Sequence, residues 1–142
     1  MDDPGHPAVL ISNRQQVQVD EAGLAELAAR TLLAEGVDGC ELSVSFVDDE
    51  EMSELHRRFM GEEGPTDVLS FPMNDDEGGV RLLGDVVIAP ALAARNNGDL
   101  EAELRLLLVH GILHLLGYDH EEDLARGEMW ARQERYSGVR AP

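Results

Sequence analysis

The sequence predicts an α+β fold, in which a mixed β-sheet of about four strands packs against helices and one apolar helix lies at the centre. The first observation is the order of the periodic segments, which reads β, α, β, α, β, β, α, α along 142 residues. The second is the length, which suits one domain with one core. We expect a single domain over residues 1–142, with flexible tails at residues 1–7 and about 137–142.

The first half of the chain shows strand and helix periods in turn. We expect a short strand at Ala8–Ser12 and a half-buried strand at Glu41–Val47, where apolar and polar residues alternate. Between them, a helix begins after the N-cap residue Asp20 and ends at Gly36. Its inward face is predicted to hold Leu24, Leu27, Ala28, Leu32 and Leu33.

A second helix is predicted from about Asp49 to Phe59, and turn-forming residues come after it. The segment Thr66–Pro72 should be extended and end at Pro72, which cannot donate a ladder hydrogen bond. We then expect an acidic loop at residues 75–79 and a strand at Leu82–Ala89, which Gly84 and Asp85 interrupt. The inward residues of the helix should be Met52, Leu55 and Phe59.

The most apolar stretch is Leu100–Leu116, with Asp99 as N-cap, and it is apolar nearly all round. It is therefore the expected central buried helix. A final helix from Glu121 to about Tyr136 should point Leu124, Met129 and Trp130 inward.

Composition limits the range of functions. The net charge of −18 disfavours a polyanion as a partner, because such a surface repels it at long range. Cys40 is the only cysteine, so neither an intramolecular disulfide nor a cysteine metal cluster is expected. The N-terminus has no pattern of a secretory signal and no run is long enough for a membrane span, so we expect a cytoplasmic protein without membrane contact.

Three histidines near the end of the buried helix predict a metal site. His110 and His114 are four residues apart and so share a helix face, while Gly117 can turn the chain back to present His120. Imidazole suits zinc, and three protein ligands leave a fourth position open for a water, as in catalytic sites. Burial of two imidazoles among leucines is unfavourable unless a partner such as a metal accepts their lone pairs.

The histidine spacing is also that of the metzincin proteases, H-E-x-x-H-x-x-G-x-x-H. Those enzymes use the glutamate after the first histidine as general base, and here that place is Gly111. A zinc metalloprotease-like hydrolase is therefore an alternative function, but this chain lacks the glutamate that would serve as its general base. Glycine inside a helix also indicates that something passes close to the backbone there.

The segment His110–His120 matches over its full length the pattern H-G-x-L-H-L-x-G-Y-D-H and so resembles the YbeY family of bacterial endoribonucleases. Two further blocks of that family occur in the same order, in residues 65–72 and 83–88, and the resemblance covers roughly Leu42 to Met129. It implies an α+β, zincin-like fold and one Zn²⁺ per chain on the three histidines. It also implies a single-strand endoribonuclease of ribosomal RNA processing, including 16S rRNA 3′ end maturation and ribosome quality control.

The resemblance further implies partners and site residues. The partners would be single-stranded ribosomal RNA, the small ribosomal subunit and assembly factors, and we expect a monomer. The segment with Thr66, Asp67 and Ser70 should border the cleft. Asp119 and Asp85 are candidates to orient a ligand imidazole or a water.

The chain departs from the family pattern on the second helix. Many members have Asn at the place of His56 and Tyr-Arg at the place of Phe59-Met60, that arginine being a proposed catalytic group. Arg57 or Arg58 is expected to supply the guanidinium in its place, with Arg58 as our candidate to act with a metal-bound water. A groove of Arg57, Arg58 and Arg81 is expected to contact RNA. Whether water or the RNA 2′-hydroxyl attacks stays open. A non-catalytic ribosome assembly factor with a structural zinc is a further alternative.

Overall fold

One mixed sheet of four strands organises the structure, a computed structural model that describes residues 7–64, 66–77, 80–96, 98–118 and 123–139. For residues 74–77, 80 and 123–126 it describes the backbone alone. The strands lie in the order β1-β2-β4-β3; β1, β2 and β4 are parallel, and β3 is antiparallel to β4. Their bounds are β1 Ala8–Arg14, β2 Cys40–Val47, β3 Val68–Glu77 and β4 Val80–Ile88. The predicted α+β class with a four-stranded mixed sheet is confirmed.

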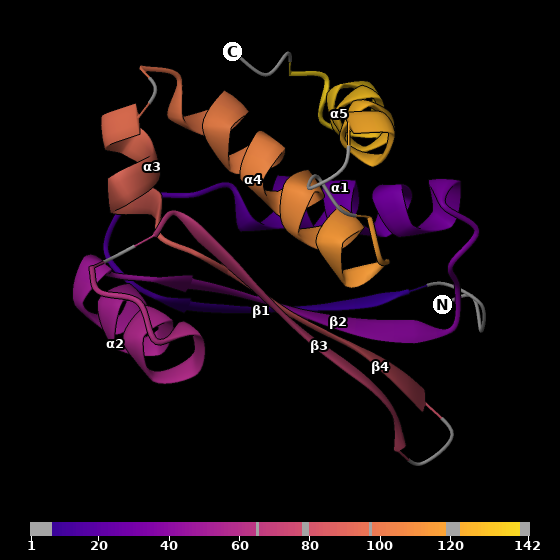
Figure 1. The fold of residues 1–142 in the computed structure, drawn as a ribbon, viewed down its shortest axis with the longest axis horizontal. Helices are drawn as coiled ribbons and strands as arrows, with labels where there is room; N and C mark the ends of the chain where they lie inside the picture. Colours follow the sequence, from indigo (N-terminus) through magenta and orange to yellow (C-terminus); the bar gives the residue numbers. More distant parts are fainter. Residues whose placement is uncertain (1–6, 65, 78–79, 97, 119–122, 140–142) are drawn as a thin grey trace.

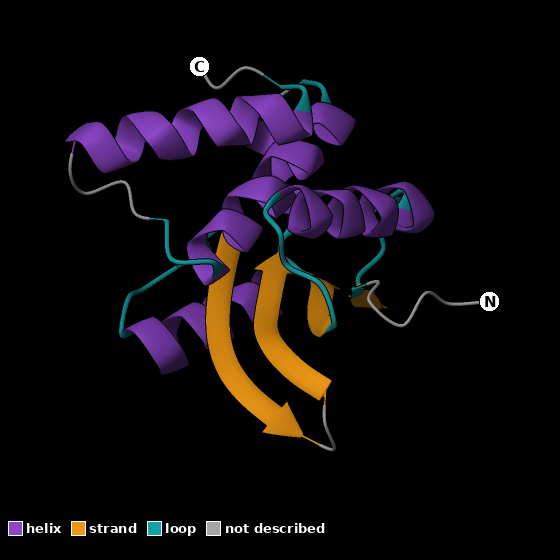
Figure 2. Ribbon diagram, turned by 90° about the vertical axis from the view of Figure 1, so that its right-hand side faces the viewer, coloured by secondary structure: helices purple, strands orange, loops and turns teal. Residues whose placement is uncertain are grey.

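Helices cover both faces of this sheet. Figures 1 and 2 show α1, α4 and α5 layered on one face, while Figure 1 shows α2 on the other and α3 at one end. The bounds are α1 Glu21–Ala34, α2 Asp49–Met60, α3 Pro90–Asn96, α4 Leu100–Leu115 and α5 Asp123–Ser137. No helix in the described part of the chain has both the length and the apolar character to cross a bilayer.

Alternation along the strands divides the core in two. On β4, Val86 and Ile88 join the larger core under α1 and α4, whereas Val87 joins a smaller core with Met52 of α2. Leu108 and Ile112 of α4 are completely buried in the larger core. The prediction of a central buried helix over Leu100–Leu116 is therefore confirmed.

Polar caps set the helix ends as predicted. Asp20 and Asp99 each accept a hydrogen bond from a backbone N–H in the first turn of their helices. The ends of α1 and α4 share one geometry: Val37 N–H donates to Leu32 O, and Tyr118 N–H donates to Leu113 O. These long backbone bonds close Schellman turns around Gly36 and Gly117, whose φ values are +75° and +99°.

Strand β3 corrects two expectations about the central segment. Pro72 does not end it, because β3 is the outermost strand of the sheet and continues to Glu77 after a register shift between Pro72 and Asp75. Residues 75–77 therefore belong to a strand and not to a loop. Gly84, whose φ is +150°, lies opposite Pro72, where an added Cβ would be 2.4 Å from the Phe71 carbonyl oxygen.

The helices also differ from what the sequence predicted. Leu33, Phe59 and Trp130 were predicted to point inward, but they are 44%, 57% and 38% exposed. Helix α3 was missed, although Pro90 suits a first helical position. The side chain of Leu124 and the start of the last helix at residues 121–122 lie outside what the structure describes. At the C-terminus, Ser137 is buried and ends α5, so the packed part extends to this residue.

Candidate metal centre

Helix α4 lies directly on the sheet at Gly111. A Cβ added there would be 2.7 Å from Val86 Cγ1 of β4 and 3.1 Å from Ser70 Oγ of β3. The Ser70 hydroxyl donates a hydrogen bond of 3.1 Å to the Gly111 carbonyl oxygen. Glycine is therefore present because the sheet occupies the place of a side chain, as the sequence predicted for a close approach.

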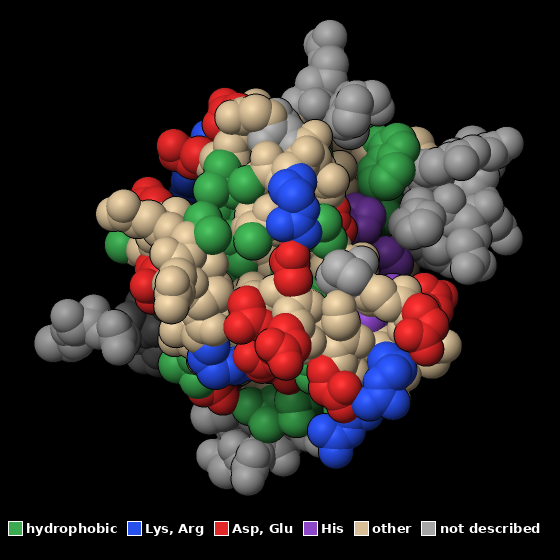
Figure 3. Space-filling model, turned by 90° about the vertical axis from the view of Figure 1, so that its left-hand side faces the viewer, with side chains coloured by type: hydrophobic (Ala, Val, Ile, Leu, Met, Phe, Trp, Pro, Cys, Tyr) green, Lys and Arg blue, Asp and Glu red, His purple; other side chains and the backbone are tan. Residues whose placement is uncertain are grey.

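The two flanking histidines face the same way. The ring centroids of His110 and His114 are 5.1 Å apart, and their planes meet at 68°. Both residues are half-buried. Figure 3 shows histidine side chains at the surface on this side of the molecule. The predicted common face of His110 and His114 is thus present.

Helix α5 supplies the surroundings of His110. Its Nδ1 lies 2.7 Å from Oε1 of Gln133, a residue only 3% exposed. The indole ring of Trp130 is 5.7 Å from the His110 ring, at a tilt of 37°. Although Trp130 is more exposed than predicted, its ring lies against that of His110.

The chain after α4 turns back at Gly117, as predicted, but Asp119 and His120 lie outside the described residues. Among the residues that are described, no three His, Cys, Asp or Glu side chains come together as metal ligands. The third ligand therefore stays a prediction, which rests on the turn geometry up to Tyr118.

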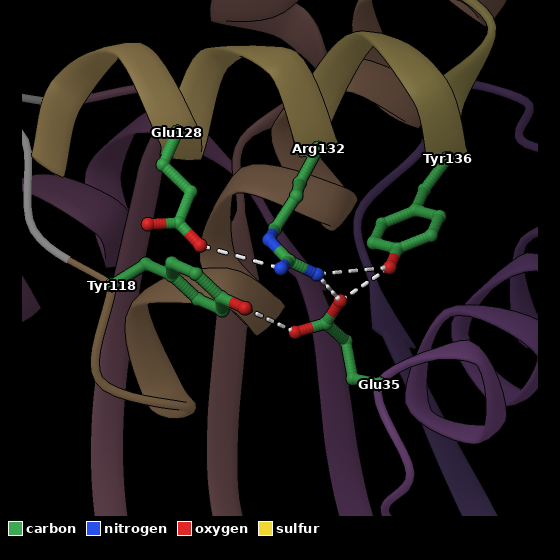
Figure 4. A network of polar contacts seen from close by, with 5 residues as sticks. All are labelled: Glu35, Tyr118, Glu128, Arg132 and Tyr136. Carbon is green, nitrogen blue, oxygen red and sulfur yellow. Dashed lines mark hydrogen bonds and ion pairs between the residues drawn. The ribbon is translucent and has the colours of Figure 1, made fainter. Parts of the chain in front are cut away.

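A buried carboxylate fixes Tyr118, the last described residue of this turn. Tyr118 Oη donates to Glu35 Oε1 over 2.6 Å, and Arg132 Nη1 and Tyr136 Oη bind Glu35 Oε2, the former at 2.6 Å. Figure 4 shows these groups converging from the end of α1, the turn after α4, and α5, with Glu128 contacting Arg132 at 3.3 Å. The network joins the three segments around the candidate centre.

This network shifts the pKa values of its members. Burial raises the pKa of Glu35, but hydrogen bonds from Tyr118, Tyr136 and Arg132 together outweigh it and bring that pKa below its ordinary 4.5. Burial and the bond to Glu35 raise the pKa of Tyr118 to about 12. Glu35 is therefore a carboxylate at neutral pH, and Tyr118 is its neutral donor.

The other predicted site residues lie at different places. Ser70 contacts α4 beside His110, through its bond to Gly111. Asp67 accepts a hydrogen bond of 3.3 Å from Asn96, the last residue of α3, and Thr66 and Asp67 come directly before β3. Asp85 is opposite Phe71 in the register and shares the face of Val87, which is turned away from α4. The structure therefore does not bring Asp85 to the histidines.

The three arginines of the expected groove are not gathered. Arg81 is the second residue of β4 and lies opposite Cys40, whereas Arg57 and Arg58 are on α2, which follows the other end of β2. Arg57 makes two hydrogen bonds of 2.8 Å to Glu54, and the Arg58 guanidinium lies 5.7 Å from the centre of the Phe59 ring.

Sequence reasoning missed Gln133 and Glu35. For Gln133 a signal existed, because it is four residues after Met129 and so shares the inward face of the last helix. A buried polar residue on such a face needs a partner, and His110 is that partner. Glu35 gave no such signal, since its partners are at least 83 residues away in the sequence.

Comparison with known proteins agrees with these features. The family model for endoribonuclease YbeY matches residues 10–138. Relatives named endoribonuclease YbeY include one from Acidothermus cellulolyticus, 48% identical over 88% of this chain and 86% of its own, and one from Thermobifida fusca, 47% identical over 87% of each chain. The relative from Frankia casuarinae is 46% identical over 89% of this chain and 71% of its own.

A solved structure supports the fold. The solution structure of a Thermotoga maritima protein superimposes with a TM-score of 0.60 at 31% identity, covering 91% of this chain and 86% of that one. The match therefore covers most of the chain and supports the α+β fold.

Proposed function

This chain belongs to the endoribonuclease YbeY family, and from that premise we propose that it is a zinc-dependent single-strand endoribonuclease of ribosomal RNA processing. The observation that supports a catalytic centre is the half-buried pair His110 and His114 on one face of α4, directly before the Gly117 turn. We place the activity in the cytoplasm, at the 3′ end of 16S rRNA and in ribosome quality control, with the small ribosomal subunit and assembly factors as partners.

The donor set fits zinc. Imidazole nitrogens are ordinary zinc ligands, and His110, His114 and His120 would hold one ion per chain while leaving a position open. The ring of His110 is already fixed by Gln133 and flanked by Trp130, so this ligand needs little ordering on binding. A bound zinc ion would supply Lewis acidity and lower the pKa of a water to about 7.

The chain's own residues would position the RNA. The Ser70 hydroxyl bonds α4 to β3, which keeps the histidine face beside the edge strand. Arg58 is our candidate to contact an RNA phosphate, with its side chain held over Phe59. Thr66 and Asp67 would border the RNA path near the start of β3. The ends of the RNA products distinguish attack by water from attack by the 2′-hydroxyl, since only attack by the 2′-hydroxyl leaves a 2′,3′-cyclic phosphate.

The test combines metal analysis with cleavage assays on single-stranded and duplex RNA. We expect about one zinc per chain, as one three-histidine site holds, and cleavage of the single strand alone. His114→Ala should stay folded but lose zinc and RNA cleavage. His56→Ala makes the same change on α2, where His56 bonds Gly64 and Glu62, and should keep both.

Two results would contradict this proposal. A His114→Ala protein that unfolds would favour the assembly factor with a structural zinc. Chelator-sensitive cleavage of casein would favour the protease, for which Gly111 leaves no general base.

A further inference from the structure

We infer that Gln133 is a positioning residue for His110: its side-chain oxygen keeps the imidazole proton on Nδ1, so that Nε2 is the nitrogen that binds the metal. The inference rests on the proposed metal site. It assigns to α5, outside the histidine motif, a part in preparing that site.

The contact is direct and shielded. Oε1 of Gln133 is 2.7 Å from Nδ1 of His110, which is a short distance for a hydrogen bond between neutral groups. Gln133 is 3% exposed, and the Trp130 ring, three residues earlier in α5, lies against the same histidine. Because so little of Gln133 meets solvent, water competes weakly for its amide oxygen.

The chemistry of the pair fixes the tautomer. A neutral imidazole carries one proton, and an amide oxygen only accepts hydrogen bonds, so Nδ1 must be the donor. The lone pair is then on Nε2, as zinc ligation requires. Hydrogen bonds of this kind orient metal-binding histidines and raise their basicity. The reverse orientation of the amide would put the proton on Nε2 and block ligation.

The packing of α5 holds Gln133 in this place. Met129, Gln133 and Ser137, spaced by four, are all buried, and the Ser137 hydroxyl donates to the Gln133 carbonyl oxygen at 2.5 Å. On the neighbouring face of the helix, Arg132 binds Glu35. These contacts fix both the rotation of α5 about its axis and its position along that axis, and the Gln133 side chain extends toward His110.

The first test uses the wild-type protein without metal. Long-range nitrogen–proton NMR spectra at pH 8 should show His110 as the Nδ1–H tautomer. A His110 that carries its proton on Nε2, or exchanges between both forms, would overturn the inference. This measurement needs neither zinc nor activity, so it decides the role of Gln133 even if the wild type binds no zinc and the proposed function fails.

The second test measures zinc affinity by competition with a chromophoric chelator. Gln133→Met removes the acceptor at similar length and should weaken zinc binding about 10- to 100-fold, the range for loss of such partners. Gln133→Glu keeps an acceptor and should bind about as tightly as wild type. Gln16→Met, the same change at an exposed position, is the control.

The variants separate orientation from packing. A folded Gln133→Met protein with unchanged zinc affinity and tautomer would refute the inference. So would equal weakening by Gln133→Glu, since the acceptor is then irrelevant. If Gln133→Met does not fold, Gln133→Glu and the wild-type spectrum still decide.

Discussion

Gly111 determines at the residue scale which chemistry α4 supports. It occupies the position of the metzincin general base, but its Cα faces Val86 and Ser70 of the sheet rather than the open side of the histidines. A glutamate there would have to enter the core or displace β4. The lack of a base at this position is therefore a consequence of the packing, and it argues against protease chemistry at the proposed site.

Gly111→Ala tests this packing. We expect a net loss of up to about 2 kcal/mol in the free energy of unfolding, because overpacking costs about 1–3 kcal/mol and alanine returns about 1 kcal/mol of helix propensity. Gly127→Ala is the control in α5, where nothing lies within 4 Å of an added Cβ, and it should stabilise by about 0.5–1 kcal/mol. Urea denaturation measures both. Stabilisation by Gly111→Ala would show that α4 sits farther from the sheet.

The element that matters most for the site is the turn after α4. Gly117 ends this helix in the same Schellman geometry in which Gly36 ends α1, and both have positive φ with open space around them. The two turns differ in the segment to which each leads. The turn at Gly117 leads to His120, whereas the turn at Gly36 leads only to strand β2.

Replacing each glycine by alanine isolates that difference. Gly117→Ala and Gly36→Ala should each lower the free energy of unfolding by about 1–2 kcal/mol, the cost of a left-handed conformation for an L-residue. Only Gly117→Ala should also weaken zinc binding, as measured by chelator competition. Equal zinc affinity in the two folded variants would mean that the turn does not position His120.

The Glu35 network ties α1, the turn and α5 together, and its effect depends on pH. Since the pKa of Glu35 is lowered in the folded protein, the unfolded chain binds more protons at acidic pH. The stabilisation is present above the ordinary value of 4.5 and is lost as the pH falls through the lower folded pKa.

Glu35→Gln should therefore destabilise the protein by about 2 kcal/mol at pH 7, the scale of a hydrogen bond to a charged group, and flatten the loss of stability in acid. Urea denaturation between pH 7 and pH 3 measures this. Glu54→Gln is the control, since the Arg57 pair of Glu54 is exposed and screened by solvent. If Glu35→Gln loses stability in acid as steeply as the wild type, the Glu35 network is not the source of that pH dependence.

At the scale of the whole molecule, a net charge of −18 opposes the binding of RNA. Figure 3 shows acidic and basic side chains interspersed on the face where histidines reach the surface. We therefore expect RNA binding to depend on a few arginine–phosphate contacts rather than on a broad basic surface. Such contacts release counterions, so RNA binding should weaken as salt rises.

Arg58 and Arg57 provide a matched comparison on one helix. Arg58→Ala should weaken single-stranded RNA binding and reduce the salt slope by about one unit, the contribution of one phosphate contact. Arg57→Ala should change little, because Arg57 already binds Glu54. RNA affinities at several salt concentrations provide the measurement. Equal effects of the two variants would argue against a specific role of Arg58.

Much of the fold could be predicted from local sequence pattern. Alternation in β2, the caps Asp20 and Asp99, and the glycines after α1 and α4 all act within a few residues, and the structure confirms them. The exposure of Phe59 could not be predicted in this way, since an apolar residue at helical spacing is buried only where another element covers it. The continuation of β3 past Pro72 likewise depends on its place at the sheet edge.

The sequence by itself determined that His110 and His114 share a helix face and that the chain turns back after them, because helix period and glycine turns are local properties. Only the tertiary structure decided that Gln133 meets His110, that Val86 excludes a side chain at position 111, and that Asp85 faces away from α4. These facts depend on how segments distant in the chain are placed against one another, which no local pattern specifies.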